Sequence, residues 1–164
     1  MWERNNYKAS RLKHVMETYQ VDTVGLQEVC VNWSKFKSSH TLASLLRYGQ
    51  QPLRSVQSHN KLEGKAKGVG KNQRGGTATI ISEQLCSYVI DSRVDHTGLG
   101  RWSWYLLEGS PGHRTRVISA YAPCGNSAIE DSTVFSQHMR YIQLKGLKTN
   151  PKSMFREDLL AMLR

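Results

Sequence analysis

The segment from residue 77 to residue 121 constrains the fold most, because it contains four short stretches rich in β-branched and aromatic residues. They lie at about residues 77–82, 86–91, 101–108 and 115–121, and turn-forming residues separate them. We expect each stretch to be a strand, and two or three of them to pair antiparallel. The sequence Glu108-Gly-Ser-Pro-Gly-His113 predicts the tip of a hairpin. This part of the chain is therefore expected to form antiparallel sheet.

A helix followed by a strand is predicted upstream of this segment. In residues 7–19 the apolar side chains recur with the spacing of one helical face, and they are Leu12, Val15, Met16 and Tyr19. Residues 23–29 then form a mostly apolar run whose β-branched residues suit a strand inside a sandwich. The predicted strand carries the carboxylate of Glu28 at its end.

Further helices are predicted on both sides of the strand-rich segment. One is expected at about residues 39–48, with Ser38 or Ser39 as its N-cap. Two more are expected at residues 133–145 and 153–163, where apolar faces recur and Gly and Pro mark the break between them. A chain of 164 residues suffices for one hydrophobic core, so we expect a single domain over residues 1–164.

A basic, glycine-rich segment lies at about residues 50–76, and we expect it to be a mobile loop outside the core. Its cationic side chains are Lys61, Lys65, Lys67, Lys71 and Arg74. Such a run of charge can touch a sugar–phosphate backbone without distinguishing bases, or it can simply be solvated. Both interpretations are open at the level of sequence.

The charge of the whole chain favours a polyanionic partner. Lysine and arginine number 23 against 13 acidic residues, which gives a formal net charge of +10, and nucleic acid is the leading candidate for such a chain. The three cysteines, Cys30, Cys86 and Cys124, are widely spaced, as is usual for a reducing compartment, so we expect an intracellular, nuclear or cytoplasmic protein. No apolar run approaches the length that crosses a bilayer, and we expect no membrane association.

Four short motifs place polar side chains beside predicted strands. Leu26-Gln27-Glu28 ends the first strand, and Arg74-Gly-Gly-Thr precedes the second. Gly100-Arg101 opens a later strand, and Tyr121-Ala-Pro-Cys-Gly-Asn126 follows another one. Pro123 prevents that strand from continuing as a regular central strand, so Tyr121 is expected at its open end. The pattern predicts a polar site built from strand ends.

In this order the motifs resemble the endonuclease/exonuclease/phosphatase superfamily. The spacing is most similar to the endonuclease domain of non-LTR retrotransposons and its apurinic/apyrimidinic endonuclease relatives. The resemblance covers most of residues 10–164. It implies an α/β fold, a DNase-I-like two-layer β-sandwich flanked by helices, and Mg²⁺-dependent (or Mn²⁺-dependent) hydrolysis of phosphodiesters, with DNA as the expected substrate.

The same resemblance implies roles for individual residues. Glu28 matches the family's metal-binding glutamate, and Tyr121 and Asn126 stand where residues that contact the scissile phosphate occur. Each has an alternative role: Glu28 as a solvated strand end, Tyr121 as a packing residue, Asn126 as a turn former. Arg101 is expected either to bind phosphate or to pair with a carboxylate such as Asp95. Trp102 and Trp104 are expected in the core.

Three motifs of the family have no match in this sequence: the asparagine of a first strand, Gly-Asp-x-Asn, and Ser-Asp-His. We therefore expect an incomplete domain that holds the metal-binding glutamate without the family's general base. Two other functions are left open. One is a chain that binds nucleic acid without catalysis, and the other is a phosphatase that acts on a small phosphoester. The sequence does not indicate an oligomeric state.

Overall fold

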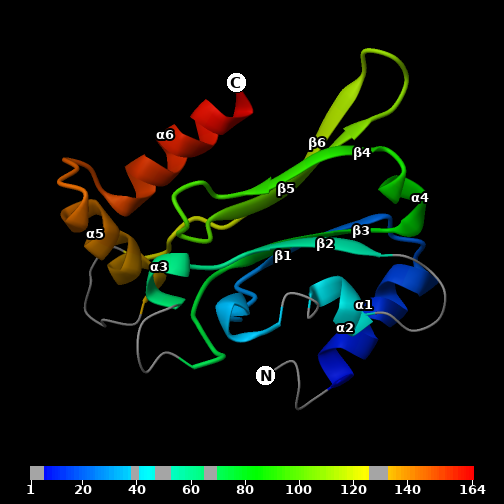
Figure 1. Ribbon diagram of the computed structural model, residues 1–164, viewed down its shortest axis with the longest axis horizontal. Coiled ribbons are helices and arrows are strands. Elements are labelled where there is room, and N and C mark those ends of the chain that lie inside the picture. The colour runs from blue at the N-terminus through cyan, green and yellow to red at the C-terminus, as the bar shows by residue number, and fades with distance from the viewer. Residues whose placement is uncertain (1–5, 38–40, 47–52, 65–69, 126–132) are drawn as a thin grey trace. The chain divides into compact units, whose positions relative to one another are not determined.

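The computed structural model describes residues 6–37, 41–46, 53–64, 70–125 and 133–164 (Figure 1). Their backbone divides into two compact units, Met1–Ala120 and Tyr121–Arg164. The first unit contains all the strands of the described residues, and the second contains two helices. The polypeptide is a mixed α/β protein, and the single domain predicted for residues 1–164 stays a prediction.

Two antiparallel sheets of three strands form the first unit. The first sheet has the order β1-β3-β2, with bounds Thr23–Gln27, Thr77–Ile81 and Arg54–Ser58. The second has the order β4-β5-β6, with bounds Val89–Val94, Trp102–Glu108 and Arg114–Ala120. The predicted strands at 77–82, 101–108 and 115–121 are confirmed. The predicted hairpin is confirmed as well, because β5 and β6 pair antiparallel from Glu108↔Arg114 to Trp102↔Ala120.

The two central strands owe their positions to their composition. All five residues of β3 are buried, and its Thr-Ala-Thr-Ile-Ile sequence offers β-branched side chains to both faces of the sheet. In β5, Trp102, Trp104 and Tyr105 are all less than 6% exposed. The core positions predicted for the two tryptophans are confirmed. A strand that has apolar side chains on both faces is most stable where other parts of the protein cover both faces, so it takes a central position in the sheet.

The two sheets face each other, and the layer between them changes from polar to apolar along the strands. In the middle of this layer, the hydroxyl group of Thr79 in β3 donates a hydrogen bond to the carbonyl oxygen of Ser103 in β5, over 2.9 Å. Two residues further along β3, Ile81 packs against Tyr105 and Leu107 in an apolar cluster. A hydrogen-bonded polar pair is thus buried in the middle of the layer, and hydrophobic burial stabilises the end beyond it.

Two helices cover the outer face of the first sheet (Figure 1). They are α1, Asn6–Thr18, and α2, Leu42–Leu46. Their apolar side chains form one buried cluster with alternate residues of β3, and its members include Ala9, Met16, Leu42, Leu46, Ala78 and Ile80. A short 3-10 helix, η1, Trp33–Lys35, follows β1. The helix predicted at residues 7–19 is confirmed, but its predicted apolar face is only partly buried, because Val15 and Tyr19 are exposed.

The prediction of a mobile loop over residues 50–76 was wrong for most of the residues described there. This segment contains the strand β2 and a short helix α3, Lys61–Gly64. Ser58 at the end of β2, and His59 and Asn60 between β2 and α3, are buried at no more than 7% exposure. Hydrophobic patterning missed these residues because polar side chains and backbone hydrogen bonds hold them in place. Lys65 and Lys67 lie outside the described residues.

Three other boundaries differ from the sequence prediction. The segment predicted as a strand at 86–91 begins as the end of a helix, α4, Glu83–Cys86, and β4 starts at Val89. The strand predicted at 23–29 ends at Gln27, because the next residue takes a left-handed backbone conformation. The cap predicted at Ser38 or Ser39 lies outside the described residues. In α2 the backbone N–H of Ser44 bonds to the Thr41 hydroxyl, so Thr41 supplies an N-terminal cap.

The second unit consists of α5, Val134–Leu144, and α6, Pro151–Leu163. Thr133 caps α5 by accepting a hydrogen bond from the backbone N–H of Ser136. Asn150 caps α6, and Pro151 occupies the first turn, where its missing N–H costs no helical hydrogen bond. Both predicted helices are confirmed, with α6 starting two residues before its predicted boundary.

Gly100 offers a test of how closely the loops of the first unit pack. Its φ is +81°, and a Cβ there would lie 2.7 Å from the carbonyl carbon of His59. We expect Gly100→Ala to lower the free energy of unfolding by about 3 kcal/mol, since a left-handed conformation and a backbone clash are both imposed. Urea unfolding followed by circular dichroism would measure the loss.

Gly112 supplies the matched control, because its φ is +80° and a Cβ there would meet nothing within 4 Å in the described structure. Gly112→Ala should therefore cost about 1 kcal/mol, the contribution of the backbone conformation alone. Equal losses in the two variants would contradict the close packing of Gly100 against the backbone of His59.

Candidate functional site

The ends of β1 and β6 are joined by hydrogen bonds that cross between the two sheets. The Gln27 side-chain amide donates to the carbonyl oxygen of Ala120 over 2.7 Å. In the reverse direction, the Ser119 hydroxyl donates to the carbonyl oxygen of Leu26 over 2.8 Å. We call these four residues the β1–β6 rim. Each side chain satisfies a backbone carbonyl of the opposite strand, so the two strand ends are held together.

Close approach at the rim depends on a small residue in β1. A Cβ built on Gly25 would lie 3.3 Å from the Cβ of Ser119, so the backbone of β1 packs directly against β6. A side chain at this position would make a tight contact with Ser119, and one of the two strands would have to shift slightly to relieve it. The glycine in the first strand therefore has a packing role, which the sequence pattern did not reveal.

Glu28 follows the rim directly and is exposed. Its φ is +50°, a left-handed conformation that costs a residue with a side chain about 1 to 2 kcal/mol. The chain is held in this conformation from both sides. On one side, Gln27 pairs with Thr77 in the sheet. On the other side, the N–H of Val29 donates to the carbonyl oxygen of Gly76 over 3.2 Å, and the N–H of Cys30 donates to that of Gly75 over 2.9 Å. The strained residue is therefore fixed by tertiary contacts, as is common at functional sites.

Tyr121 is the first residue after Ala120 and is partly buried. It begins the second unit, whereas Glu28 belongs to the first. Both candidate residues thus follow directly, in the chain, one member of the hydrogen-bonded pair Gln27–Ala120. Asn126, the second candidate for phosphate contact, lies outside the described residues.

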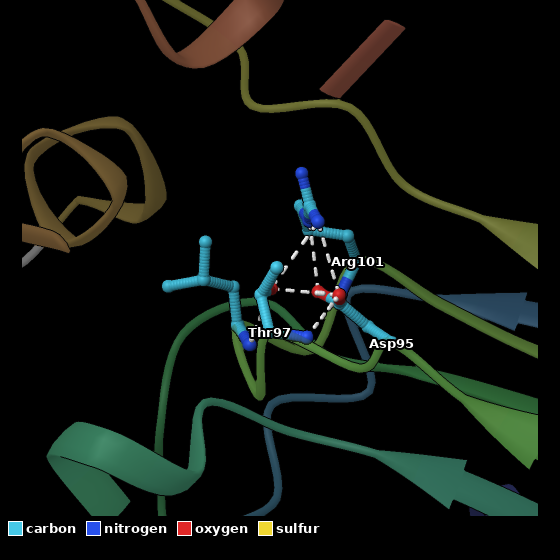
Figure 2. Close-up of polar contacts among 4 residues, drawn as sticks. Asp95, Thr97 and Arg101 are labelled. Carbon is cyan, nitrogen blue, oxygen red and sulfur yellow. Dashed lines mark hydrogen bonds and ion pairs between the residues drawn. The ribbon is translucent and has the colours of Figure 1, made fainter. Parts of the chain in front are cut away.

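Arg101 forms a buried ion pair, which confirms the pairing with Asp95 that the sequence left as an alternative. Its Nε lies 2.8 Å from Asp95 Oδ2, its Nη2 lies 3.0 Å from Asp95 Oδ1, and both side chains are 0% exposed. Thr97 donates to the same carboxylate (Figure 2). Burial by itself raises the pKa of Asp95, but the hydrogen bonds and charge of Arg101 outweigh it and hold the pKa below its ordinary value.

The described basic residues of the 61–74 segment lie on the surface. Lys61 starts α3 and is exposed, and Lys71 and Arg74 are exposed beside the segment that follows β1. The Lys71 ammonium lies 5.0 Å from the centre of the Phe36 ring, within range of a cation–π contact. The backbone N–H of Asn32 donates to the Lys71 carbonyl oxygen, so the backbone at Lys71 is ordered by its neighbours.

Sequence reasoning missed a buried polar cluster that supports the loops beside β3. In it, the Gln73 side chain donates to the carbonyl oxygen of Asn60 over 2.9 Å, and Asn60 accepts from the N–H of Leu62. His59 is 7% exposed. Burial, together with the charge of Lys61, lowers the pKa of His59 to about 4. No sequence signal marks such residues, because their partners lie far away in the chain.

Comparison with known proteins does not constrain the function of this chain. No protein-family model matches this chain, and no curated protein matches it. Within the described ranges, no three histidine, cysteine, aspartate or glutamate residues are grouped so that they could hold a metal ion. Among those same residues, no helix is both long enough and apolar enough to span a membrane. The candidate site therefore depends on the geometry of the β1–β6 rim.

The buried His59 makes the stability of the protein depend on pH. Between pH 6.5 and 4 the unfolded chain binds a proton at this histidine and the folded protein does not. Stability contributed by neutral His59 is therefore complete above pH 6.5 and is lost as the pH falls toward 4. The two pKa values correspond to a total of about 3 kcal/mol, which denaturant unfolding at a series of pH values would measure.

A His59→Leu variant should lack this part of the pH dependence. His113→Leu, at the exposed hairpin tip, serves as the control and should keep it. Asp95, whose pKa is lowered, contributes in a different window, because its stabilisation is lost as the pH falls below 3.8. The same slope between pH 7 and 4 in both histidine variants would disprove the role of His59.

Proposed function

We propose that this chain is part of a DNase-I-like sandwich of the endonuclease/exonuclease/phosphatase superfamily, similar to retrotransposon endonuclease domains, and that it takes part in phosphodiester hydrolysis of nucleic acid. The observation that carries the proposal is the hydrogen bond between Gln27 and Ala120. Consecutive Cα atoms are about 3.8 Å apart, so Glu28 and Tyr121 each start one residue from a joined pair. A carboxylate and a phenol therefore each follow, in the chain, one member of this hydrogen-bonded pair.

Glu28 fits the role of a Mg²⁺ or Mn²⁺ ligand. Its carboxylate is a hard oxygen donor at a strand end, it is exposed, and the left-handed backbone fixes where it starts. Mg²⁺ retains several waters when bound to proteins, so a site with few protein carboxylates is normal. The metal ion would supply charge stabilisation at a phosphoryl oxygen. Glu28 itself would hold and orient the ion.

In this proposal Tyr121 positions the substrate. Its hydroxyl can donate a hydrogen bond to a phosphate oxygen, and Asn126 is the second candidate for that contact. Arg101 contributes differently from a phosphate ligand, because Asp95 already occupies two of its nitrogens in the buried pair. We assign Arg101 a positioning role, since it fixes the turn that packs Gly100 against His59.

Nucleic acid, and DNA first, is the proposed partner. The formal charge of +10 favours a polyanion over a small uncharged substrate. Lys61, Lys71 and Arg74 are exposed cations of the 61–74 segment and are the proposed backbone contacts. An intracellular location, nuclear or cytoplasmic, accompanies this proposal, because three widely spaced cysteines suit a reducing compartment.

Glu28→Gln tests the metal ligand. The substitution keeps the size of the side chain and removes its charge, so we expect Mn²⁺ affinity to fall about tenfold or more, the effect of losing one charged ligand. Titration calorimetry or electron paramagnetic resonance of Mn²⁺ would measure the change. The unfolding midpoint in urea should stay the same, since Glu28 is exposed.

Glu17→Gln is the matched control, because Glu17 is an exposed glutamate of α1 that pairs with Lys13 over 3.3 Å. It should leave Mn²⁺ binding as in the original chain. Unchanged Mn²⁺ affinity in Glu28→Gln would remove the metal assignment. DNA binding without Mn²⁺ binding in the original chain would support a binding protein without catalysis, and preferential cleavage of small phosphoesters would support a phosphatase.

Charge neutralisation tests the contact with nucleic acid. A variant with four lysines of the basic segment changed to glutamine, Lys61, Lys65, Lys67 and Lys71, should bind DNA with a weaker dependence on salt. Each lost phosphate contact lowers the slope of log K against log salt concentration by about 0.9 for duplex DNA. Fluorescence anisotropy over a range of KCl concentrations would give the slope.

The control variant loses the same amount of charge from the second unit, at Lys145, Lys148, Lys152 and Arg156. It has the same net charge as the first variant but keeps the 61–74 segment intact. Equal slopes in the two variants would show that overall charge, and not this segment, attracts DNA.

A further inference from the structure

The strand β1 lies at one edge of the first sheet, because the order of its strands is β1-β3-β2. Its pairing with β3 shows which of its backbone groups face outward. The backbone N–H of Ser82 donates to the carbonyl oxygen of Asp22, and these two residues continue the register of the β1–β3 pair. In an antiparallel pair, residues that bond to the neighbouring strand alternate with residues that do not. Val24 and Leu26 therefore bond to β3, and the residues that alternate with them turn their N–H and C=O groups away from it.

Three residues of β1 carry these outward-facing groups, and they are Thr23, Gly25 and Gln27. Gly25 and Gln27 are exposed, and Thr23 is partly buried. Within the described ranges, the outward N–H and C=O groups of these residues have no backbone partner. They recur at every second residue, about 7 Å apart, which is the repeat that a further strand would match. The edge of β1 is therefore open to pairing.

The other edge strands have features that oppose pairing, and β1 lacks them. The register of β4 with β5 is interrupted by a bulge between Val89 and Asp91. The strands β2 and β6 begin with the charged residues Arg54 and Arg114. Bulges and charged side chains keep a second strand from adding to an edge. The Thr-Val-Gly-Leu-Gln sequence of β1 contains no charge and no proline, and its register with β3 is unbroken.

The two faces of β1 determine which side chains an added strand needs. On one face, Val24 and Leu26 pack against the apolar cluster that the helices α1 and α2 form with β3. A neighbouring strand would place apolar, preferably β-branched, residues beside them. On the other face, a Cβ built on Gly25 would lie 3.3 Å from the Cβ of Ser119, so small polar residues suit that face. An extended segment in which apolar and small polar residues alternate matches both faces.

Acidic side chains stand at both ends of β1. Asp22 precedes the strand, Glu28 follows it, and both are exposed. The Ser82 hydroxyl donates to the Asp22 carboxylate over 2.7 Å and holds it in place. In a chain with a formal net charge of +10, two carboxylates at one edge attract basic groups locally. A second copy of this chain fits less well, because antiparallel pairing of β1 with itself around Gly25 would bring Asp22 beside Glu28 of the copy.

We propose that the open edge of β1 binds an extended segment of another protein, which adds a strand to the first sheet. The segment alternates apolar and small polar residues and carries a basic residue at each end, opposite Asp22 and Glu28. Backbone hydrogen bonds to Thr23, Gly25 and Gln27 supply the affinity, and the side chains supply the selectivity. The proposal depends neither on nuclease activity nor on metal binding.

Hydrogen exchange of the full chain, followed by nuclear magnetic resonance, tests the edge without any substitution. The probe is the peptide Lys-Val-Ser-Val-Ser-Val-Lys with both ends blocked. At saturation it should slow exchange of the Thr23, Gly25 and Gln27 amides by about tenfold or more, since each gains a backbone acceptor or is covered. Val24 and Leu26 are the internal control, because their amides bond to β3 with or without the peptide.

Substitutions in β1 and in the peptide separate backbone pairing from charge, and fluorescence anisotropy would give the affinities. Thr23→Pro removes an outward N–H at the first residue of a strand, where proline is tolerated, and should weaken peptide binding about tenfold or more. Thr23→Val keeps the N–H and is the matched control. Asp22→Asn keeps the acceptor for the Ser82 hydroxyl and should weaken binding about threefold. A peptide with glutamate at both ends should bind more weakly than the lysine peptide.

Several outcomes would overturn the proposal. Slow exchange of the three outward amides in the chain alone would show that the edge is already covered. Exchange that stays unchanged at millimolar peptide, or equal peptide affinity in Thr23→Pro and Thr23→Val, would exclude strand addition. Slowing that grows with protein concentration, together with a dimer in analytical ultracentrifugation, would assign the edge to a second copy instead. Equal affinity for the lysine and glutamate peptides would overturn the choice of basic ends.

Discussion

The hydrogen bonds between the two sheets determine the geometry of the first unit. Thr79 bonds to Ser103 in the middle of the layer, and Gln27 and Ser119 bond across its β1–β6 rim. Buried polar groups are costly unless they are bonded, so the buried contact of Thr79 with Ser103 fixes the relative register of the sheets more narrowly than apolar packing would. The ends of β1 and β6 are then held together, and the residues that follow them begin from a defined position.

A second constraint is the buried ion pair of Asp95 and Arg101. Removing one partner of such a pair leaves a buried charge and typically costs about 3 to 5 kcal/mol. The Arg101 guanidinium also stacks on the Trp102 ring, with its carbon 4.3 Å from the ring centre. The pair therefore joins the turn after β4 to the start of β5. Arg101, which the sequence offered as a candidate phosphate ligand, therefore stabilises this loop.

The sequence predicted the regular elements well because their signals are local. Three of the four strands predicted in residues 77–121, and the helix α1, follow from periodicity and turn residues, and the structure contains them. The fourth predicted strand begins within α4, and β2 was not predicted. The sequence did not predict the burial of His59 and Asn60, because both are polar and lie between the polar residues Ser58 and Lys61. Their burial depends on Gln73 and on Gly100, which lie 13 and more residues away. Contacts of this kind have no periodic signature.

The sequence by itself determined that Glu28 and Tyr121 each lie near the end of a strand, because strand propensity and chain breakers act over a few residues. Only the tertiary structure decided that those two strands end side by side and that Arg101 is buried against Asp95. It also decided that Gly25 packs closely against Ser119. The physical reason is that these outcomes depend on hydrogen bonds and steric contacts between distant segments, whose pairing is settled when the two sheets pack together.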